Sequence, residues 1–133
     1  MIEQYQVQVF SSNYALYADM SARVISTLTA FSLRAEVYSI DESFLDVSHI
    51  PLEQLSDYGH EVRETVWRLT GIPVSVGIAS TKTLAKVANE VAKHNPRYQG
   101  ILNLTCYTEE ELDELLASLA IKGSAYPILL FVR

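Results

Sequence analysis

The sequence is poor in cysteine, in long apolar runs and in basic residues, and each scarcity excludes a class of protein. The single cysteine, Cys106, has no partner for an intrachain disulfide. The longest apolar stretch, residues 125–132, is far shorter than the roughly 20 residues that cross a bilayer. No basic and apolar leader pattern occurs near the start. We therefore expect a cytoplasmic protein in a reducing setting, without membrane contact.

Basic residues are outnumbered, with 10 Lys and Arg against 16 Asp and Glu and a net charge of −6. This balance argues against a stand-alone nucleic-acid binder, because contact with phosphates depends on clustered Lys and Arg. The charges are unevenly distributed, since residues 82–97 are locally basic and residues 109–114 are acidic. The 133 residues, 49% of them apolar, suffice for one domain with a core.

Apolar spacing and cap residues predict alternating helices and strands. The expected helices cover residues 14–31, about 51–70, 82–94 and 108–119, and the expected strands cover 7–10, 34–40, 44–47, 74–79 and 101–104. Hairpin-connected strands followed by helices indicate an α+β fold of the ferredoxin-like kind, with an antiparallel or mixed sheet and helices on one face. Residues 121–133 have neither a cap nor a period, and we predict no place for them.

Asp41 and Glu42 are adjacent at the point where the first hairpin turns. Neighbouring side chains of a strand point to opposite faces, so two such carboxylates converge on one ion only at a strand end or bend. Mg²⁺ commonly binds through one or two carboxylates together with substrate phosphates. The pair therefore predicts a magnesium site. Asp46 is a weaker third candidate, because Asp more commonly serves turns and caps through local hydrogen bonds.

The helix expected at 82–94 carries Lys82, Lys86 and Lys93 along one face. Such a stripe is by itself typical of a solvated helix face. The helix follows a strand of small residues directly, however, and its free N-terminal N–H groups favour an anion. We keep a phosphate site with Lys82 or Lys86 as counter-charge beside the solvated-face interpretation.

Three segments, in order along the chain, resemble the palm of Y-family, error-prone DNA polymerases, most closely the UmuC branch. They are residues 11–21, 39–46 and 76–89, and the similarity extends from about Val9 to Ser118. The resemblance implies that Asp41 and Glu42 are catalytic metal ligands and that Lys86 contacts the triphosphate of a dNTP. It also implies Mg²⁺ as cofactor and nucleotidyl transfer to a DNA primer, in translesion synthesis, DNA repair and mutagenesis during the SOS response. The implied partners are primer-template DNA, dNTP, processed UmuD, the RecA filament and the sliding clamp.

The pattern of the family is incomplete in this sequence. Residues 1–8 lack the metal-binding Asp of the family's central palm strand and its steric gate, and no thumb or little-finger pattern follows Leu119. We therefore expect residues 1–119 to form a partial palm and residues 120–133 a divergent tail. We expect no polymerase activity from this polypeptide alone. A missing central strand predicts exposed apolar edges and low solubility.

Two other functions fit the same residues. A cyclase-like palm enzyme shares the topology and an acidic pair at a hairpin. A non-catalytic module derived from UmuC would bind UmuD-type partners without turnover.

Overall fold

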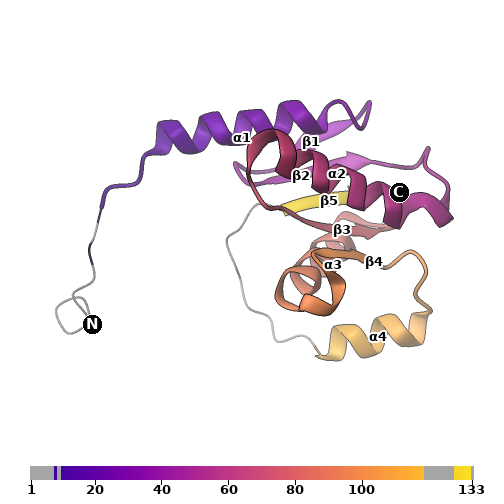
Figure 1. Ribbon diagram of the computed structural model, residues 1–133. Helices are drawn as coiled ribbons and strands as arrows, with labels where there is room; N and C mark the ends of the chain where they lie inside the picture. The colour runs from indigo at the N-terminus through magenta and orange to yellow at the C-terminus, as the bar shows by residue number, and fades with distance from the viewer. Residues whose placement is uncertain (1–7, 9, 119–127, 133) are drawn as a thin grey trace.

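One mixed sheet of five strands, in the order β1-β2-β5-β3-β4, organises the molecule (Figure 1). The computed structural model describes residues 8, 10–118 and 128–132. Its elements are α1 (Tyr14–Leu28), β1 (Ala35–Val37), β2 (Glu42–Asp46), η1 (Leu52–Gln54), α2 (Leu55–Thr70), β3 (Ser75–Ala79), α3 (Lys82–His94), η2 (Pro96–Tyr98), β4 (Ile101–Asn103), α4 (Glu109–Ser118) and β5 (Ile128–Val132). The expected α+β fold with a mixed sheet is confirmed.

The strand pairings include the predicted hairpin. β1 runs antiparallel to β2, with Glu36 opposite Phe44. β3 and β4 are parallel, and β5 runs parallel to both β2 and β3. Among the described residues no helix has the length and apolar character needed to cross a bilayer.

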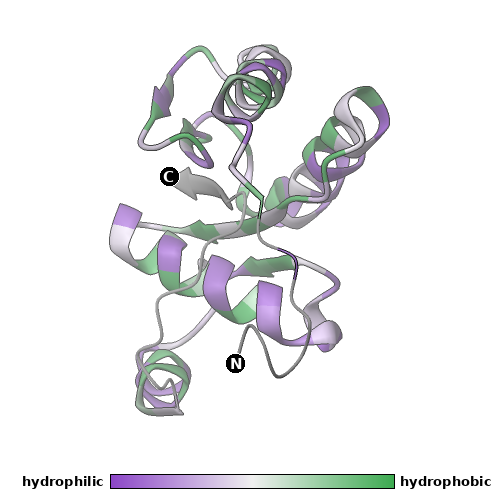
Figure 2. Cartoon of the chain, turned by 90° about the vertical axis from the view of Figure 1, so that its left-hand side faces the viewer, coloured by the Kyte–Doolittle hydropathy of each residue, from purple (hydrophilic) through white to green (hydrophobic). Residues whose placement is uncertain are grey.

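Helices cover both faces of the sheet, so the expectation of helices on one face was wrong. α1 and α2 lie on one side in Figure 1, and α3 and α4 lie on the other. Each side has its own core, one around Leu45, Val62 and Val66 and one around Phe44 and Ala88. The physical reason is that parallel strands are joined by crossovers, here helices, which bury both faces. The hydrophobic positions of the helices accordingly turn toward the strands (Figure 2).

The small residues of β3 let α3 approach closely. A Cβ added at Gly77 would lie 2.1 Å from the Ala85 carbonyl oxygen and 2.4 Å from the Asn89 nitrogen. Val76 and Ile78 alternate with Gly77 and pack in the core on the α2 side. The element that packs tightly on the small-residue face of β3 is therefore α3.

Several helix ends lie at residue types that are typical caps. Asn13 and Thr81 accept hydrogen bonds from the N–H groups of Leu16 and Leu84, at 3.0 and 3.2 Å. Gly71, at φ +72°, ends α2. In contrast, α1 ends at Leu28, three residues before the expected end, and Phe31 instead packs edge-on against Tyr58, with ring centroids 6.0 Å apart.

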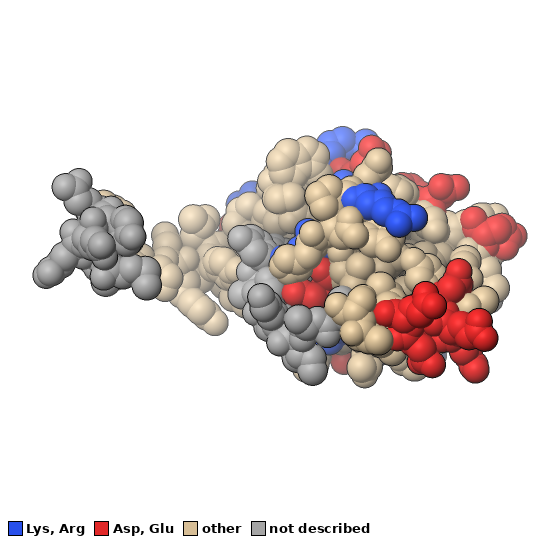
Figure 3. Space-filling model, turned by 90° about the horizontal axis from the view of Figure 1, so that it is seen from below, with Lys and Arg blue, Asp and Glu red and all other residues tan. Residues whose placement is uncertain are grey.

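One expected strand is not observed, whereas the acidic helix lies where it was expected. Gln8 and Phe10 are not in a strand, and the rest of the strand expected at 7–10 lies outside the described residues. The acidic end of the sequence forms most of α4, whose first turn carries Glu109, Glu110 and Glu111, and acidic side chains gather on that side of the face seen in Figure 3.

The centre of the sheet is filled by β5, for which the sequence offered no place. Ile128 pairs with Glu42 on one side and with Ser75 on the other. Leu130 likewise pairs with both Phe44 and Gly77. Among the described strands, β2 and β3 share no direct ladder. The expected open centre is therefore absent from this structure, because β5 closes it.

Candidate functional site

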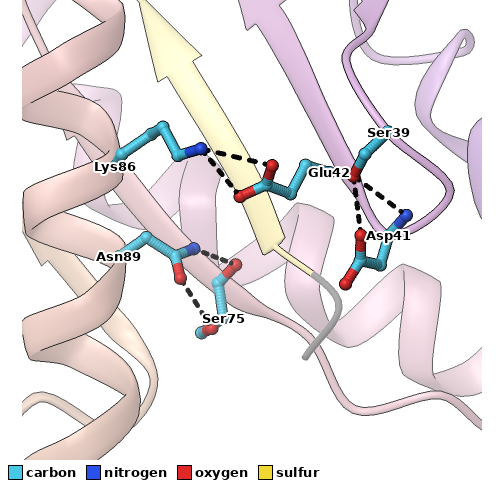
Figure 4. Close-up of polar contacts among 6 residues, drawn as sticks. All are labelled: Ser39, Asp41, Glu42, Ser75, Lys86 and Asn89. Atoms are coloured by element: carbon cyan, nitrogen blue, oxygen red, sulfur yellow. Dashed lines mark hydrogen bonds and ion pairs between the residues drawn. The ribbon is translucent and has the colours of Figure 1, made fainter. Parts of the chain in front are cut away.

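Glu42 and Lys86 form an ion pair above the central strand. The Lys86 Nζ lies 3.1 Å from Glu42 Oε1 and 3.3 Å from Oε2 (Figure 4). The Glu42 side chain is only 14% exposed, whereas that of Lys86 is 41% exposed. The Lys86 ammonium also lies 4.6 Å from the centroid of the Tyr38 ring, which favours a cation. Lys86 is thus held at the surface by a carboxylate and an aromatic face.

Strand alternation explains why Glu42 faces α3. Phe44, two residues along β2, packs in the core beside α3, whereas Leu45 packs in the core beside α2. Because β5 separates β2 from β3, the side chains of Glu42 and Lys86 meet over β5 (Figure 4). Lys86 belongs to α3, which packs against β3. β3 is two strand spacings, about 10 Å, from β2, and the two long side chains reach across that distance.

Asp41 lies in the turn before β2, and its carboxylate is directed elsewhere. The Asp41 Oδ1 accepts a hydrogen bond from Ser39 Oγ at 2.6 Å, and the Asp41 N–H donates to Ser39 Oγ at 3.4 Å (Figure 4). Asp41 also lines a cavity of about 510 Å³ together with Leu16 and Met20 of α1. The two neighbouring acids therefore share a strand end but face different sides of it.

Asp46 has the local role that the sequence favoured. Its Oδ1 accepts the Ser48 N–H at 2.9 Å. The hydrogen bonds from the side chain and backbone of Ser48 hold the pKa of Asp46 below its usual value of 3.8, and Arg34 contributes in the same direction. Asp46 thus shapes the turn after β2.

Lys82, the other candidate counter-charge, is bound at a different place. Its Nζ lies 2.5 Å from Glu36 Oε2 on β1 and 5.0 Å from the centroid of the Phe44 ring. Sequence reasoning did not single out Glu36 or Tyr38, because neither belongs to a motif. The one available signal was that both lie in the arm that pairs with β2.

The donor set fits one hard cation at most, together with a phosphate ligand. Within the described part of the chain, no three His, Cys, Asp or Glu residues gather closely enough to hold a metal. Asp41 and Glu42 offer the carboxylate oxygens that Mg²⁺ binds alongside substrate phosphates. Each has a polar partner already, Ser39 for Asp41 and Lys86 for Glu42. Cation binding by Glu42 therefore requires Lys86 to change partner.

Comparison with known proteins places these residues in a wider group. Residues 2–90 match the impB/mucB/samB family. The chain is 50% identical over 101 residues to Protein UmuC of Salmonella typhimurium, covering 74% of this chain and 24% of that protein. It is 43% identical over 114 residues to Protein ImpB of Salmonella typhimurium, covering 84% of this chain and 26% of that protein. It is 30% identical over 112 residues to DNA polymerase IV of Saccharolobus solfataricus, covering 80% of this chain and 29% of that protein. The chain thus spans about a quarter of the length of these relatives.

Proposed function

The chain belongs to the impB/mucB/samB family, and from this premise we propose that it forms the nucleotide-binding part of the palm of a UmuC-like, error-prone DNA polymerase. The observation that carries the proposal is the contact of 3.1 Å between Lys86 and Glu42, which joins two segments of the family match. The activity of the whole protein would be translesion synthesis on primer-template DNA with dNTP substrates. The relative from Saccharolobus solfataricus is named a DNA polymerase, DNA polymerase IV.

Glu42 is the proposed Mg²⁺ ligand, joined by Asp41 when the Asp41 carboxylate leaves Ser39 and turns toward it, and Lys86 is the proposed contact to the triphosphate. The cation would neutralise phosphate charge and polarise the phosphoryl oxygens. In the structure described here Lys86 neutralises Glu42, so the mostly buried carboxylate is not left unpaired. With a metal-bound triphosphate, Glu42 would hold the cation and Lys86 would pair with a phosphate oxygen instead of with Glu42. Each charge keeps an opposite charge through the exchange, which limits its electrostatic cost.

We further propose that the 133-residue polypeptide does not elongate primers by itself. Two-ion nucleotidyl transfer needs carboxylates that hold both cations. Asp41 and Glu42 are consecutive and face different sides of the strand end. The same proposal includes a processed UmuD partner, the RecA filament, the sliding clamp and a cytoplasmic location. It also includes the division of the chain into a partial palm, residues 1–119, and a tail, residues 120–133.

The relatives favour this proposal over a cyclase-like enzyme. Their names are UmuC, ImpB and DNA polymerase IV, and the family match includes both Glu42 and Lys86. A non-catalytic module remains compatible with the same residues, and it predicts no nucleotide binding at Lys86.

Titration with a fluorescent dNTP, with and without Mg²⁺, tests the proposal. We expect Mg²⁺-dependent binding that Lys86→Met weakens about tenfold or more, as expected for the loss of one charge-assisted hydrogen bond. Glu42→Gln should remove the Mg²⁺ dependence. Lys93→Met, on the same helix but lining a different cavity, is the matched control. Equal binding by wild type and Lys86→Met would contradict the proposed site, and primer extension by the purified chain would contradict the proposed inactivity.

A further inference from the structure

Arg63 of α2 is held in one orientation beside the start of β3. Its Nε donates a hydrogen bond to the Val74 carbonyl at 3.0 Å. The guanidinium also lies against Gly100, because a Cβ added at Gly100 would lie 2.8 Å from the Arg63 Nε and 3.3 Å from Nη2. Gly100 has φ +82°, a conformation that glycine adopts without strain. Among the described residues, the two terminal amino groups of Arg63 have no hydrogen-bond or ion-pair partner, so they remain available to a ligand.

Arg63 lines a cavity of about 780 Å³ whose charged side chains are all basic. Lys93 and His94, at the end of α3, line the same cavity, and no Asp or Glu of the described residues does. The His94 Nδ1 donates to the Glu90 carbonyl at 3.0 Å and lies 3.3 Å from Glu90 Oε1, which leaves its Nε2 for another partner. A chain with a net charge of −6 thus gathers basic side chains from two helices around one cavity, which favours an anion.

A phosphate group matches these donors better than a carboxylate does. The terminal amino groups of Arg63 carry four N–H donors in a planar fork that pairs with two phosphate oxygens. His94 comes from a different helix, and a phosphate keeps further oxygens for it, whereas both oxygens of a carboxylate would already be engaged. The cavity is also within the size range of sites that hold small organic molecules, so it has room for more than a bare phosphate.

An aromatic side chain lies next to Arg63 on the same helix. Trp67 follows Arg63 by one turn of α2 and is 56% exposed. Both residues line a second cavity, of about 340 Å³, together with Pro73 and Val74. Glu64 lines this second cavity as well, so it does not favour another anion there. An exposed indole beside a guanidinium suits a nucleobase, because every base has a planar face that stacks on aromatic side chains.

We propose that Arg63, His94 and Trp67 form a site for a nucleotide unit, with its phosphate held by Arg63 and His94 and its base on Trp67. A free mononucleotide and a single-stranded nucleic acid both present this unit. The site needs no Mg²⁺, because side chains supply its positive charge. The inference does not rest on the proposed function, since the site shares no residue with the contact between Glu42 and Lys86.

The intrinsic fluorescence of Trp67 provides the test, because Trp67 is the one tryptophan of the chain. The full chain is titrated with AMP, adenosine and inorganic phosphate in the presence of EDTA, which removes any Mg²⁺-dependent binding elsewhere. We expect saturable quenching by AMP, binding of adenosine that is about tenfold or more weaker, and competition of phosphate with AMP. Absence of saturable AMP binding, or equal affinities for AMP and adenosine, would overturn the proposal.

The form of the phosphate distinguishes the two sources of the nucleotide unit. The dinucleoside monophosphate ApA has an internucleotide phosphate and no terminal one, whereas AMP is a phosphomonoester. Tighter binding of ApA and of single-stranded oligo(dA) would support a nucleic-acid strand as the ligand. Tighter binding of AMP would support a free nucleotide, and failure of all three to bind would overturn the proposal.

Variants of α2 test the two halves of the site. Arg63→Met should weaken AMP binding about tenfold or more, whereas Arg68→Met, which removes a charge of the same helix outside both cavities, should not. Trp67→Ala, followed by calorimetry, should weaken AMP binding about fivefold or more and leave phosphate binding unchanged. Leu69→Ala, an exposed apolar residue of the same helix, is its control. Unchanged AMP binding by Arg63→Met or by Trp67→Ala would overturn the proposal.

A measurement on the wild type complements these variants, because Arg63→Met also loses the hydrogen bond to the Val74 carbonyl. In nitrogen-15 NMR spectra recorded with EDTA, inorganic phosphate should shift the Arg63 Nε–H and the Gly100 amide signals most. Phosphate-induced shifts that instead centre on Lys86 would overturn the proposal. Failure of the dNTP titration at Lys86 would leave the expected shifts at Arg63 unchanged, so the two proposals fail separately.

Discussion

Lys86 and Glu42 are 44 positions apart in the sequence, yet their charged atoms lie 3.1 Å apart across a strand that belongs to neither of their own elements. The contact therefore depends on β5, which sets the spacing between β2 and β3. A change in the central strand should consequently affect the candidate site, although β5 lies far from both residues in the sequence.

The two lysine ion pairs at this face should differ in their effect on stability. Lys86→Met leaves the Glu42 carboxylate, 14% exposed, without its counter-charge, and we expect a loss of about 1–2 kcal/mol in the free energy of unfolding. Lys82→Met is the matched control, because its partner Glu36 is 56% exposed and such surface pairs contribute less than about 1 kcal/mol. Urea denaturation measures both. Equal losses would show that the burial of Glu42 is not what makes its ion pair matter.

Gly77→Ala should strongly destabilise the fold. The added methyl would meet backbone atoms of Ala85 and Asn89 that cannot move without shifting α3. We expect a loss of about 3 kcal/mol, at the upper end for overpacking of a core. Gly71→Ala is the comparison, since a Cβ at Gly71 meets open space. There only the positive φ strains the backbone, and we expect a loss of about 1 kcal/mol in the free energy of unfolding. Thermal unfolding of both variants measures the difference. Equal unfolding midpoints would contradict the close packing of α3 against β3.

Asn89→Ala should cost more than Ser75→Ala. The Asn89 side chain is buried, donates to the Ser75 carbonyl at 2.8 Å, and contacts the Ser75 hydroxyl at 3.1 Å (Figure 4). Asn89→Ala leaves the Ser75 carbonyl without that hydrogen bond, and the free energy of unfolding should fall by about 2 kcal/mol. Ser75→Ala removes only the hydroxyl contact, so its loss should be smaller. The difference between the two unfolding free energies is the quantity to measure, and a larger loss for Ser75→Ala would contradict the assignment.

Asp46 makes stability depend on acid pH in a defined direction. Its folded-state pKa is lowered below 3.8, so its contribution is present above about pH 4 and is lost as the pH falls through the folded-state pKa. Asp46→Asn removes the charge and keeps an oxygen that can accept the Ser48 N–H. The melting temperatures of wild type and Asp46→Asn should therefore differ near neutral pH and converge as the pH falls below the folded-state pKa of Asp46. A difference in melting temperature that persists unchanged in acid would show that the substitution acts through the geometry of the turn rather than through the charge of Asp46.

The parts of the fold that were predictable depend on residues close together in the sequence. Asn13 and Thr81 cap their helices through bonds to residues three positions on, and Gly71 ends α2 by its own backbone conformation. The hairpin around Asp41 and Glu42 follows from two short strand-forming runs joined by a turn. The local role of Asp46 needs only Ser48.

The parts that were not predictable depend on pairing between distant segments. Nothing near residues 128–132 states that they pair with both β2 and β3, because backbone ladders form irrespective of side-chain identity. The helical periodicity left Lys82 and Lys86 equivalent, although the family resemblance favoured Lys86, and only the docking of α3 directed one to Glu36 and the other to Glu42.

The sequence by itself therefore determined the approximate positions of the four α-helices and of β1 to β4, and that two acids meet at a turn, since these follow from the backbone periodicities and short-range hydrogen bonds. Tertiary structure alone decided that β5 fills the centre of the sheet, that helices cover both faces, and that Glu42 rather than Asp41 faces Lys86. The physical reason is that these features arise from packing and strand pairing between segments far apart in the chain, which no local pattern encodes.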